Sequence, residues 1–208
     1  MSGAHIVIAI TGASGAIYGL RLCAELLGSG ARLTLLVSTA GRQVLREECG
    51  LDCQGSEASI GQQLREYFHA EKEQLSYYAE DNFLAPIASG SSAPDAMVVC
   101  PCSMGTLSRI ASGSAGNLAE RCADVMLKER RMLVMVPRET PLNEIHLENM
   151  LKLARMGVRI VPPMPAFYHQ PRSLDDVVNF VVGKILDTLG IGHTLFTRWG
   201  ETGVKRTR

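Results

Sequence analysis

The chain has 208 residues, which fits one domain and suffices to bury roughly 70% of its unfolded surface without a disulfide or a metal. Its 21 Lys and Arg residues balance its 21 Asp and Glu residues, which argues against an overall basic field for nucleic acid and against an acidic tail. The six cysteines have no disulfide-framework spacing, no apolar run approaches the ~20 residues of a membrane span, and the start lacks a secretory signal pattern. We therefore expect a cytoplasmic protein in which the charges that attract a ligand are concentrated at one local site.

The first predicted strand, residues 5–10, runs into a turn of small residues at 11–15 and then into a helical pattern at 16–27. Gly12 and Gly15 remove the Cβ atoms that would keep a ligand from the backbone, and Ser14 places a hydroxyl at the positive end of the helix dipole. Such a turn suits an anion, most plausibly a phosphate ester. The glycine spacing matches neither the dinucleotide fingerprint nor the P-loop, so a plain structural turn is equally favoured here.

A second strand is predicted at 32–38, followed by a helix that Gly50 ends. This alternation of strands and helices predicts a doubly wound parallel sheet with right-handed crossovers. Glu47 and Glu48 lie near the end of the helix, where the dipole disfavours carboxylates. That placement hints at a use, although an exposed surface pair is the more economical interpretation from these residues alone.

The region at 53–78 is polar and only weakly helical, with a short strand candidate at 75–78. Residues 88–93 (ASGSSA) are small and polar, which is typical both of loops that cover sites and of linkers. A third strand at 96–100 leads into the small-residue turn 101–106 and another helix, which repeats the architecture of the first turn. Two such turns at the carboxyl ends of neighbouring strands are expected to line one crevice. Cys102 lies in this turn, but no histidine is placed to activate it, so a buried, inert thiol is favoured over a nucleophile.

Charged residues follow in the next helix and after the next strand. Arg121 and Lys128 share one stripe of a helix predicted at 117–129, where they suit joint binding of an anion, while Asp124 lies one turn from both and favours a solvated ion-paired face. A strand at 132–136 delivers Arg138 and Glu139 at its carboxyl end, where this architecture places ligand contacts. Topology therefore makes Arg138 the leading candidate site residue.

The last third of the chain is predicted to hold a helix at 143–156, a short strand at 158–161, a proline-rich connector at 162–171 and a helix at 175–189. Phe167 and Tyr168 in the connector suit either a binding wall or a core plug. Trp199 lies beyond the predicted elements, and we expect it to dock on a neighbouring subunit. The histidines have no metal-ligand spacing, so no metal site is expected, and neither a G-x-S-x-G elbow nor an RNA-binding strand pattern is present.

Seven motifs, in order over nearly the whole chain, resemble the UbiX family of flavin prenyltransferases. They are TGASGAIYG, ASGSSAP, PCSMGTLS, ADVMLKERR, VPRETP, HLENMLKL and PPMPAFYHQP. The resemblance implies a Rossmann-like or flavodoxin-like parallel sheet in a single flavoprotein domain spanning 1–208, with a tail at 190–208 on a neighbouring subunit. It also implies homododecamers with sites between subunits.

The resemblance further implies an activity and its residues. The enzyme would transfer a dimethylallyl group from dimethylallyl phosphate to N5 and C6 of reduced FMN, and the prenylated FMN would serve a UbiD-type decarboxylase. FMN contacts are implied at Gly12, Ala13, Ser14, Ser38, Ser103, Met104, Gly105, Thr106 and Arg138. Contacts to the donor are implied at Ser89, Arg121, Lys128, Arg138, Glu139, Tyr168 and Lys184. Catalytic roles are implied for Ser14, Glu48, Lys128, Glu139 and Trp199, which for Glu48 reverses the preference for a mere surface acid.

Two departures from the family pattern stand out, because Lys184 replaces a common arginine and Gly116 replaces a common aspartate. Lysine keeps the charge but loses the planar fork that binds phosphate in a bidentate manner. The alternatives to a transferase are an FMN-dependent decarboxylase and a non-catalytic FMN carrier. A carrier has no need of a second phosphate site, so the basic residues favour the transferase. The sequence leaves open whether a monophosphate or a diphosphate donor is preferred.

Overall fold

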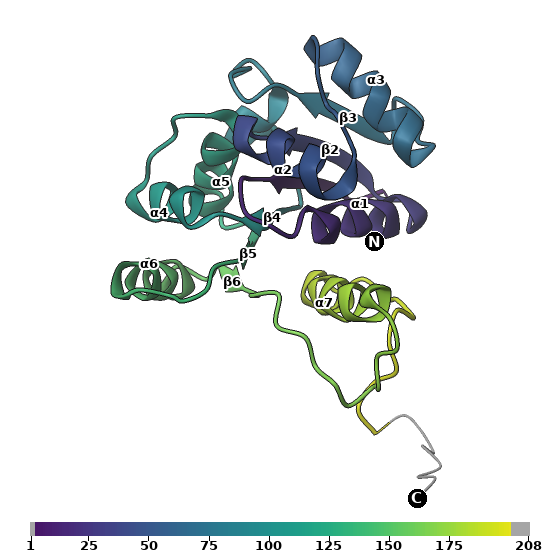
Figure 1. Ribbon diagram of the computed structural model, residues 1–208. Helices are drawn as coiled ribbons and strands as arrows, with labels where there is room; N and C mark the ends of the chain where they lie inside the picture. Colours follow the sequence, from purple (N-terminus) through teal and green to yellow (C-terminus); the bar gives the residue numbers. More distant parts are fainter. Residues whose placement is uncertain (1–2, 201–208) are drawn as a thin grey trace, which may run out of the picture.

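The computed structural model describes residues 3–200, in which a six-stranded parallel sheet is covered by helices on both faces (Figure 1). The strands are β1 (His5–Ile10), β2 (Arg32–Val37), β3 (Leu75–Tyr78), β4 (Ala96–Cys102), β5 (Met132–Pro137) and β6 (Arg159–Ile160). The helices are α1 (Ala16–Gly28), α2 (Thr39–Cys49), α3 (Glu57–Phe68), α4 (Met104–Ser112), α5 (Leu118–Lys128), α6 (Glu144–Arg155) and α7 (Leu174–Leu189), with short 3-10 turns η1 (Pro86–Ala88) and η2 (Gly90–Ser92). The predicted doubly wound α/β architecture is confirmed.

The strand order β3-β2-β1-β4-β5-β6 places the topological switch point between β1 and β4. From β1 the chain moves outward to β2 and β3, and it then returns to β4 and moves outward the other way. Ile8 lies opposite both Leu35 of β2 and Val98 of β4, so β1 is central. Ligands of open parallel sheets bind outside the carboxyl ends of the strands at such a point.

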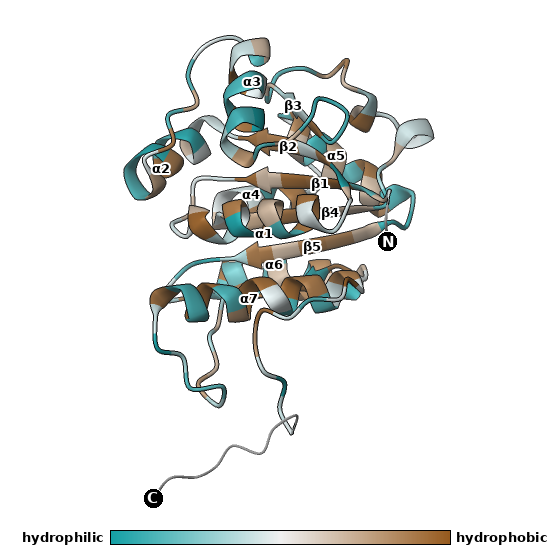
Figure 2. Ribbon diagram, turned by 90° about the vertical axis from the view of Figure 1, so that its right-hand side faces the viewer, coloured by the Kyte–Doolittle hydropathy of each residue, from teal (hydrophilic) through white to brown (hydrophobic). Residues whose placement is uncertain are grey.

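Two apolar layers hold the sheet between its helices. One layer joins the sheet to α1, α2, α3 and α7, and the other joins it to α4, α5 and α6. In Figure 2 the central strands are hydrophobic along their length, as expected for parallel strands buried on both faces. The carboxyl ends of these strands are thus held on a rigid base.

Two local differences from the sequence-based predictions have clear causes. The region considered only weakly helical contains α3, which Ser56 caps through Ser59 N and which buries Ile60 and Leu64 against the sheet. β4 continues to Cys102, whose thiol is buried, and this burial raises its pKa far above the usual range. The preference for an inert Cys102 is therefore supported. Within residues 3–200, none of the helices has the length and apolar character needed to cross a membrane.

Candidate functional site

Thr11 fastens the two small-residue turns to each other at the switch point. Its hydroxyl donates to the carbonyl of Pro101 at 2.8 Å and accepts from the amide of Ser103 at 2.8 Å. The residue is 2% exposed, so these bonds lie in a dry environment where they are strong. The expectation that the turns after β1 and β4 line one crevice is confirmed.

Two glycines let the backbones beside this crevice approach closely. A Cβ on Gly12 would lie 2.5 Å from the Cβ of Ala40, and a Cβ on Gly41 would lie 2.5 Å from the backbone oxygen of Ile10. The loops after β1 and β2 therefore touch with no room for another side chain. Beside them is a small hollow whose polar lining includes Thr11, Ser38, Glu80, Thr106 and Asn117.

Replacing Gly41 by alanine is expected to lower the free energy of unfolding by about 1 to 3 kcal/mol, because the methyl group must push the rigid end of β1 aside. Denaturant unfolding followed by circular dichroism measures the change. Gly28→Ala is the matched control, since a Cβ there would meet no atom within 4 Å. Equal effects of the two substitutions would contradict the close approach.

The amino terminus of α1 holds an anion, and that anion is Glu48. Gly15 N and Ala16 N donate to Glu48 Oε2 at 2.8 and 3.1 Å. Gly15 has φ +103° and lacks a side-chain cap, so the carboxylate at the end of α2 takes the capping position. Because Glu48 occupies these two amides, a ligand phosphate at this turn would contact the backbone of Gly12, Ala13 and Ser14 instead.

Ser14, Glu48 and Arg138 form what we call the carboxyl-edge cluster. The Arg138 Nε donates to the carbonyl of Ser14 at 3.2 Å. Partial burial would raise the pKa of Glu48, but hydrogen bonds from the Ser14 hydroxyl and from the Gly15 and Ala16 amides, with the charge of Arg138, outweigh it and lower the pKa. The cluster thus holds a charged carboxylate beside a serine hydroxyl, a geometry that suits proton transfer.

Other expected ligand contacts surround the same crevice. Ser38 caps α2 through Gly41 N at 3.0 Å, and Ser103 caps α4 through Thr106 N at 3.3 Å, with Met104 and Gly105 in the first turn of α4. Glu139 follows Arg138, and its carboxylate accepts from Thr140 N at 3.0 Å. The structure thus brings the residues expected at FMN to one edge of the sheet.

Ser89, Arg121 and Lys128 form a second group, the α5 cluster. Arg121 Nε donates to the carbonyl of Ala88 at 3.0 Å, and its NH1 pairs with Asp124 at 2.8 Å. A Cβ on Gly90 would lie 2.5 Å from the Nζ of Lys128, so Lys128 stands beside this loop. Asp124 therefore pairs with Arg121, whereas Lys128 pairs with Glu129.

Lys128 of the α5 cluster and the carboxyl-edge cluster lie at opposite ends of β5. Lys128 ends α5 just before β5 begins, whereas Arg138 directly follows the end of β5. The six residues of β5 separate the two positions by about 20 Å along the strand. Crossover helices run antiparallel to the strands, so α5 carries Lys128 to the amino edge of the sheet, away from the carboxyl-edge cluster of its own chain.

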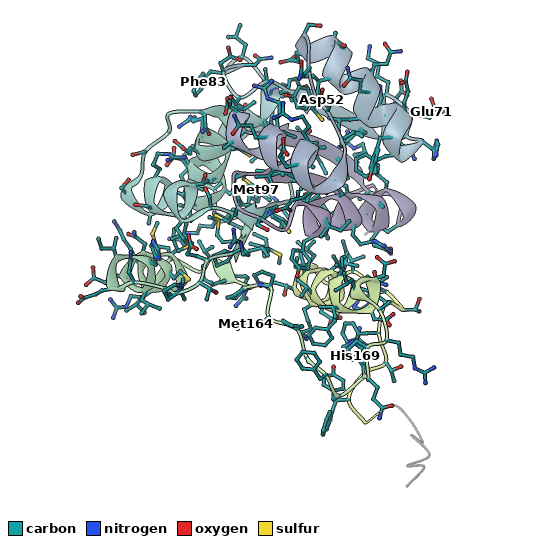
Figure 3. All side chains as sticks on the ribbon, viewed as in Figure 1. Asp52, Glu71, Phe83, Met97, Met164 and His169 are labelled. Atoms are coloured by element: carbon teal, nitrogen blue, oxygen red, sulfur yellow. The ribbon has the colours of Figure 1, made fainter. Side chains whose placement is uncertain are left out.

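Tyr168, Lys184 and Trp199 form a third group, the tail cluster. The rings of Tyr168 and Trp199 meet edge to face at 5.2 Å, and Lys184 Nζ lies 3.4 Å from Asp187. Figure 3 shows the neighbouring His169 beyond α7, away from Met97 in the sheet. Phe167 is 70% exposed and hence is no core plug. The part of the tail at 201–208 lies outside the described residues.

Some residues that shape these groups were not singled out from the sequence. Thr11, Gly41 and Glu80 line or build the crevice, and Glu80 accepts from the Thr39 amide and hydroxyl at the start of α2. The carboxylate of Asp187 accepts hydrogen bonds from the segment that follows α7. A glycine in the first turn of a helix, as at 41, could have indicated close packing, whereas nothing local points to Glu80 or Asp187.

Comparisons with known proteins show the family and the fold. The flavoprotein family model matches residues 1–186. A Halalkalibacterium halodurans protein, flavin prenyltransferase UbiX, is 56% identical over 194 residues, which are 93% of this chain and 92% of the relative. The structure of AnUbiX (PadA1) in complex with FMN and dimethylallyl pyrophosphate has a TM-score of 0.85 and 38% identity, covering 95% of this chain and 98% of the other. A dodecameric FMN-dependent UbiX-like decarboxylase from Escherichia coli O157:H7 has a TM-score of 0.82 and 40% identity, covering 94% and 98%.

Proposed function

The chain belongs to the UbiX flavin prenyltransferases of the flavoprotein family, and from this premise we propose that its carboxyl-edge crevice binds reduced FMN for prenylation at N5 and C6. The observation that carries the proposal is the carboxyl-edge cluster, in which a charged Glu48, the Ser14 hydroxyl and Arg138 lie together at the start of α1. The protein is a flavin prenyltransferase, and the substrate atoms and residue roles below are our proposals.

The residues present fit FMN. The hollow combines an apolar wall that includes Ile10, Leu36 and Val37 with the hydroxyls of Thr11, Ser38 and Thr106 and the amide of Asn117. Gly12 and Gly41 let the loops after β1 and β2 meet closely beside it. Carboxylates of Glu48 and Glu80 already sit on backbone amides at the starts of α1 and α2, which is the geometry that an anion takes there. We assign FMN contacts to Gly12, Ala13, Ser14, Ser38, Ser103, Met104, Gly105, Thr106 and Arg138.

When bound, reduced FMN supplies the nucleophilic nitrogen and carbon that take up the prenyl group. Breaking the allylic C–O bond of the donor leaves negative charge on the departing phosphate, which preorganised cationic donors stabilise. We assign this task to Arg121, Lys128, Tyr168 and Lys184, and we assign further contacts to the donor to Ser89, Arg138 and Glu139. Each charge-assisted hydrogen bond is worth about 1.5 to 3 kcal/mol, so three or four make a large contribution to the rate.

Residues of the chain also stabilise the carbocation and transfer the protons. Aromatic faces stabilise an allyl cation without trapping it, and the edge-to-face pair of Tyr168 and Trp199 offers such a wall. Ser14 donates to the Glu48 carboxylate, so a proton that reaches the hydroxyl has an acceptor in place. We propose that this pair moves the protons released when the new bonds form.

We propose that the complete site lies between subunits of a homododecamer. The support is the separation of about 20 Å between Lys128 and Arg138 along β5, which no side chain spans. A neighbouring copy that placed its α5 cluster at the crevice would join the two groups. The dodecameric assembly of the Escherichia coli relative supports this arrangement.

The exposed apolar face of α6 offers one subunit contact. Leu147 and Leu151, one turn apart on this face, are 52% and 51% exposed. Changing Leu147 and Leu151 together to serine is expected to lower the molar mass measured by light scattering, because burying each leucine stabilises a contact by about 1.5 to 3 kcal/mol. Leu174→Ser, at an 84% exposed site on α7, is the control. An unchanged assembly in the double variant would contradict this placement.

The proposed function is tested by anaerobic incubation with reduced FMN and dimethylallyl phosphate. We expect the flavin to gain the mass of one isoprene unit, whereas an unchanged flavin mass with folded, FMN-bound protein would refute the proposal. A parallel incubation with an aromatic acid tests the decarboxylase alternative, and dimethylallyl diphosphate tests donor preference. We further propose that a UbiD-type decarboxylase receives the product, and that the protein works in the cytoplasm, where its six free thiols suit a reducing milieu.

A further inference from the structure

The chain folds back on itself after α7. Residues 191–199, here called the C-terminal strap, follow Gly190, the C-cap of α7. The amide of Ile191 donates to the carbonyl of Leu186 at 2.9 Å. Phe196 packs on Phe180 of α7 with ring centroids 4.8 Å apart. A Cβ on Gly183 would lie 2.5 Å from Phe196 and 2.6 Å from His193. The strap thus packs closely on α7 at Gly183, where any side chain would collide with it.

The carboxylate of Asp187 is the polar anchor of the strap. Arg198 donates to both of its oxygens, at 2.7 and 3.1 Å, in the bidentate geometry that suits a guanidinium. His193 Nε2 lies 3.2 Å from the same carboxylate, and the His193 side chain is 2% exposed. One side chain of α7 therefore holds both ends of a short loop.

An acidic residue in the last turn of a helix is unfavourable by itself, because it faces the negative end of the dipole. Asp187 occupies that turn, which contains no basic residue. Its pKa is nevertheless lowered to about 2, first of all by the hydrogen bond from Arg198 and further by the charge of that residue. The contacts with the strap therefore outweigh the helix dipole and keep the carboxylate charged.

The anchor adjoins residues of the tail cluster. Trp199 directly follows Arg198, and its ring meets Tyr168 edge to face at 5.2 Å. Lys184 lies one turn before Asp187, with Nζ 3.4 Å from the carboxylate and the side chain 51% exposed. The Asp187 carboxylate thus contacts both Lys184 and the residue before Trp199. It is not itself part of the aromatic pair formed by Tyr168 and Trp199.

We propose that Asp187 is a positioning residue that fixes the C-terminal strap through Arg198 and His193 and thereby holds Trp199 against Tyr168 at the prenyl donor. The last step rests on the proposed function, whereas the anchoring of the strap does not. Without the carboxylate, Arg198 and His193 lose their shared acceptor and the strap leaves α7. Trp199 then no longer forms part of a preorganised wall for the cation.

The test uses the full-length protein in its native assembly and exploits the single tryptophan of the chain. Nanosecond fluorescence anisotropy decay reports the motion of Trp199 directly. In Asp187→Asn we expect a larger fast component than in the wild type and a fall in kcat for prenyl transfer of about 10- to 100-fold, since misplacing a group near the reacting atoms costs that much. Asp175→Asn is the matched control, because Asp175 also lies on α7 and forms an ion pair, with Arg21 at 3.3 Å.

Arg198→Gln supplies an independent variant in case Asp187→Asn fails to fold. It should also show a larger fast component than the wild type, and the double variant should show no more than Asp187→Asn alone, because the Arg198 contact is one of those that Asp187→Asn breaks. An unchanged anisotropy decay in both single variants would overturn the anchor, and a mobile Trp199 with wild-type kcat would overturn the role in positioning. Should the wild type transfer no prenyl group, the proposed function fails, while the anisotropy comparison still decides the anchor.

Discussion

Replacing Glu48 by glutamine is expected to lower the kcat of prenyl transfer by about 10²-fold or more, the range typical of general acid–base groups. The amide keeps the size of the side chain and one acceptor for the amides of Gly15 and Ala16, but it cannot take a proton from Ser14. Product formation is measured under anaerobic single-turnover conditions, with flavin binding measured separately. We expect FMN affinity to change much less than kcat.

Glu47→Gln is the matched control, since Glu47 is adjacent, 71% exposed and paired with Arg46 at 3.0 Å. It should leave kcat unchanged. Equal losses in the two variants would show that only the general charge of the helix end matters, and they would remove Glu48 from the proton path.

The pH dependence follows from the lowered pKa of Glu48. A carboxyl whose folded-state pKa lies below its unfolded value, about 4.3, stabilises the fold above that value, and this contribution is lost as the pH falls through the folded pKa. Both the rate and this stabilising contribution should therefore hold through neutral pH and decline only at acid pH. The Glu48→Gln variant should therefore not show this loss of stability at acid pH.

Replacing Lys128 by methionine is the second substitution with a large expected effect. We expect kcat/KM for dimethylallyl phosphate to fall by about 10²- to 10³-fold, the cost of removing one preorganised donor from a developing oxyanion. FMN binding should persist, because Lys128 is assigned to the donor phosphate and is not among the proposed FMN contacts. Steady-state kinetics and flavin titration measure the two effects. Lys152→Met, which removes an exposed lysine of α6, is the control.

Mixing the two damaged chains tests whether the site is shared. If Glu48 and Lys128 act at one site from different subunits, co-expression of Glu48→Gln and Lys128→Met chains should leave roughly a quarter of the sites intact in both residues. Activity should then rise well above that of either variant alone. Co-assembled but inactive protein would place both residues at a site within one chain or remove one of them from the reaction.

The elements of the fold were largely predictable because their patterns are local. The runs predicted as strands at 5–10, 32–38 and 96–100 form β1, β2 and β4, and Gly50 ends α2 as a left-handed C-cap. Helix α3 was underestimated because its buried face has few apolar residues, and its burial depends on contact with β3 and the sheet. The polar composition of that segment hides this tertiary contact.

The sequence by itself determined the layer architecture, the two small-residue turns and the residues of the family motifs, because hydrophobic periodicity and turn chemistry act between near neighbours. Only the tertiary structure decided that Glu48 caps α1, that Thr11 joins β1 to β4 and that Asp187 anchors the strap. It also decided that Lys128 and Arg138 lie at opposite edges of the sheet. The physical reason is that these relations join residues distant along the chain, whose separation is set by how crossover helices pack across the strands.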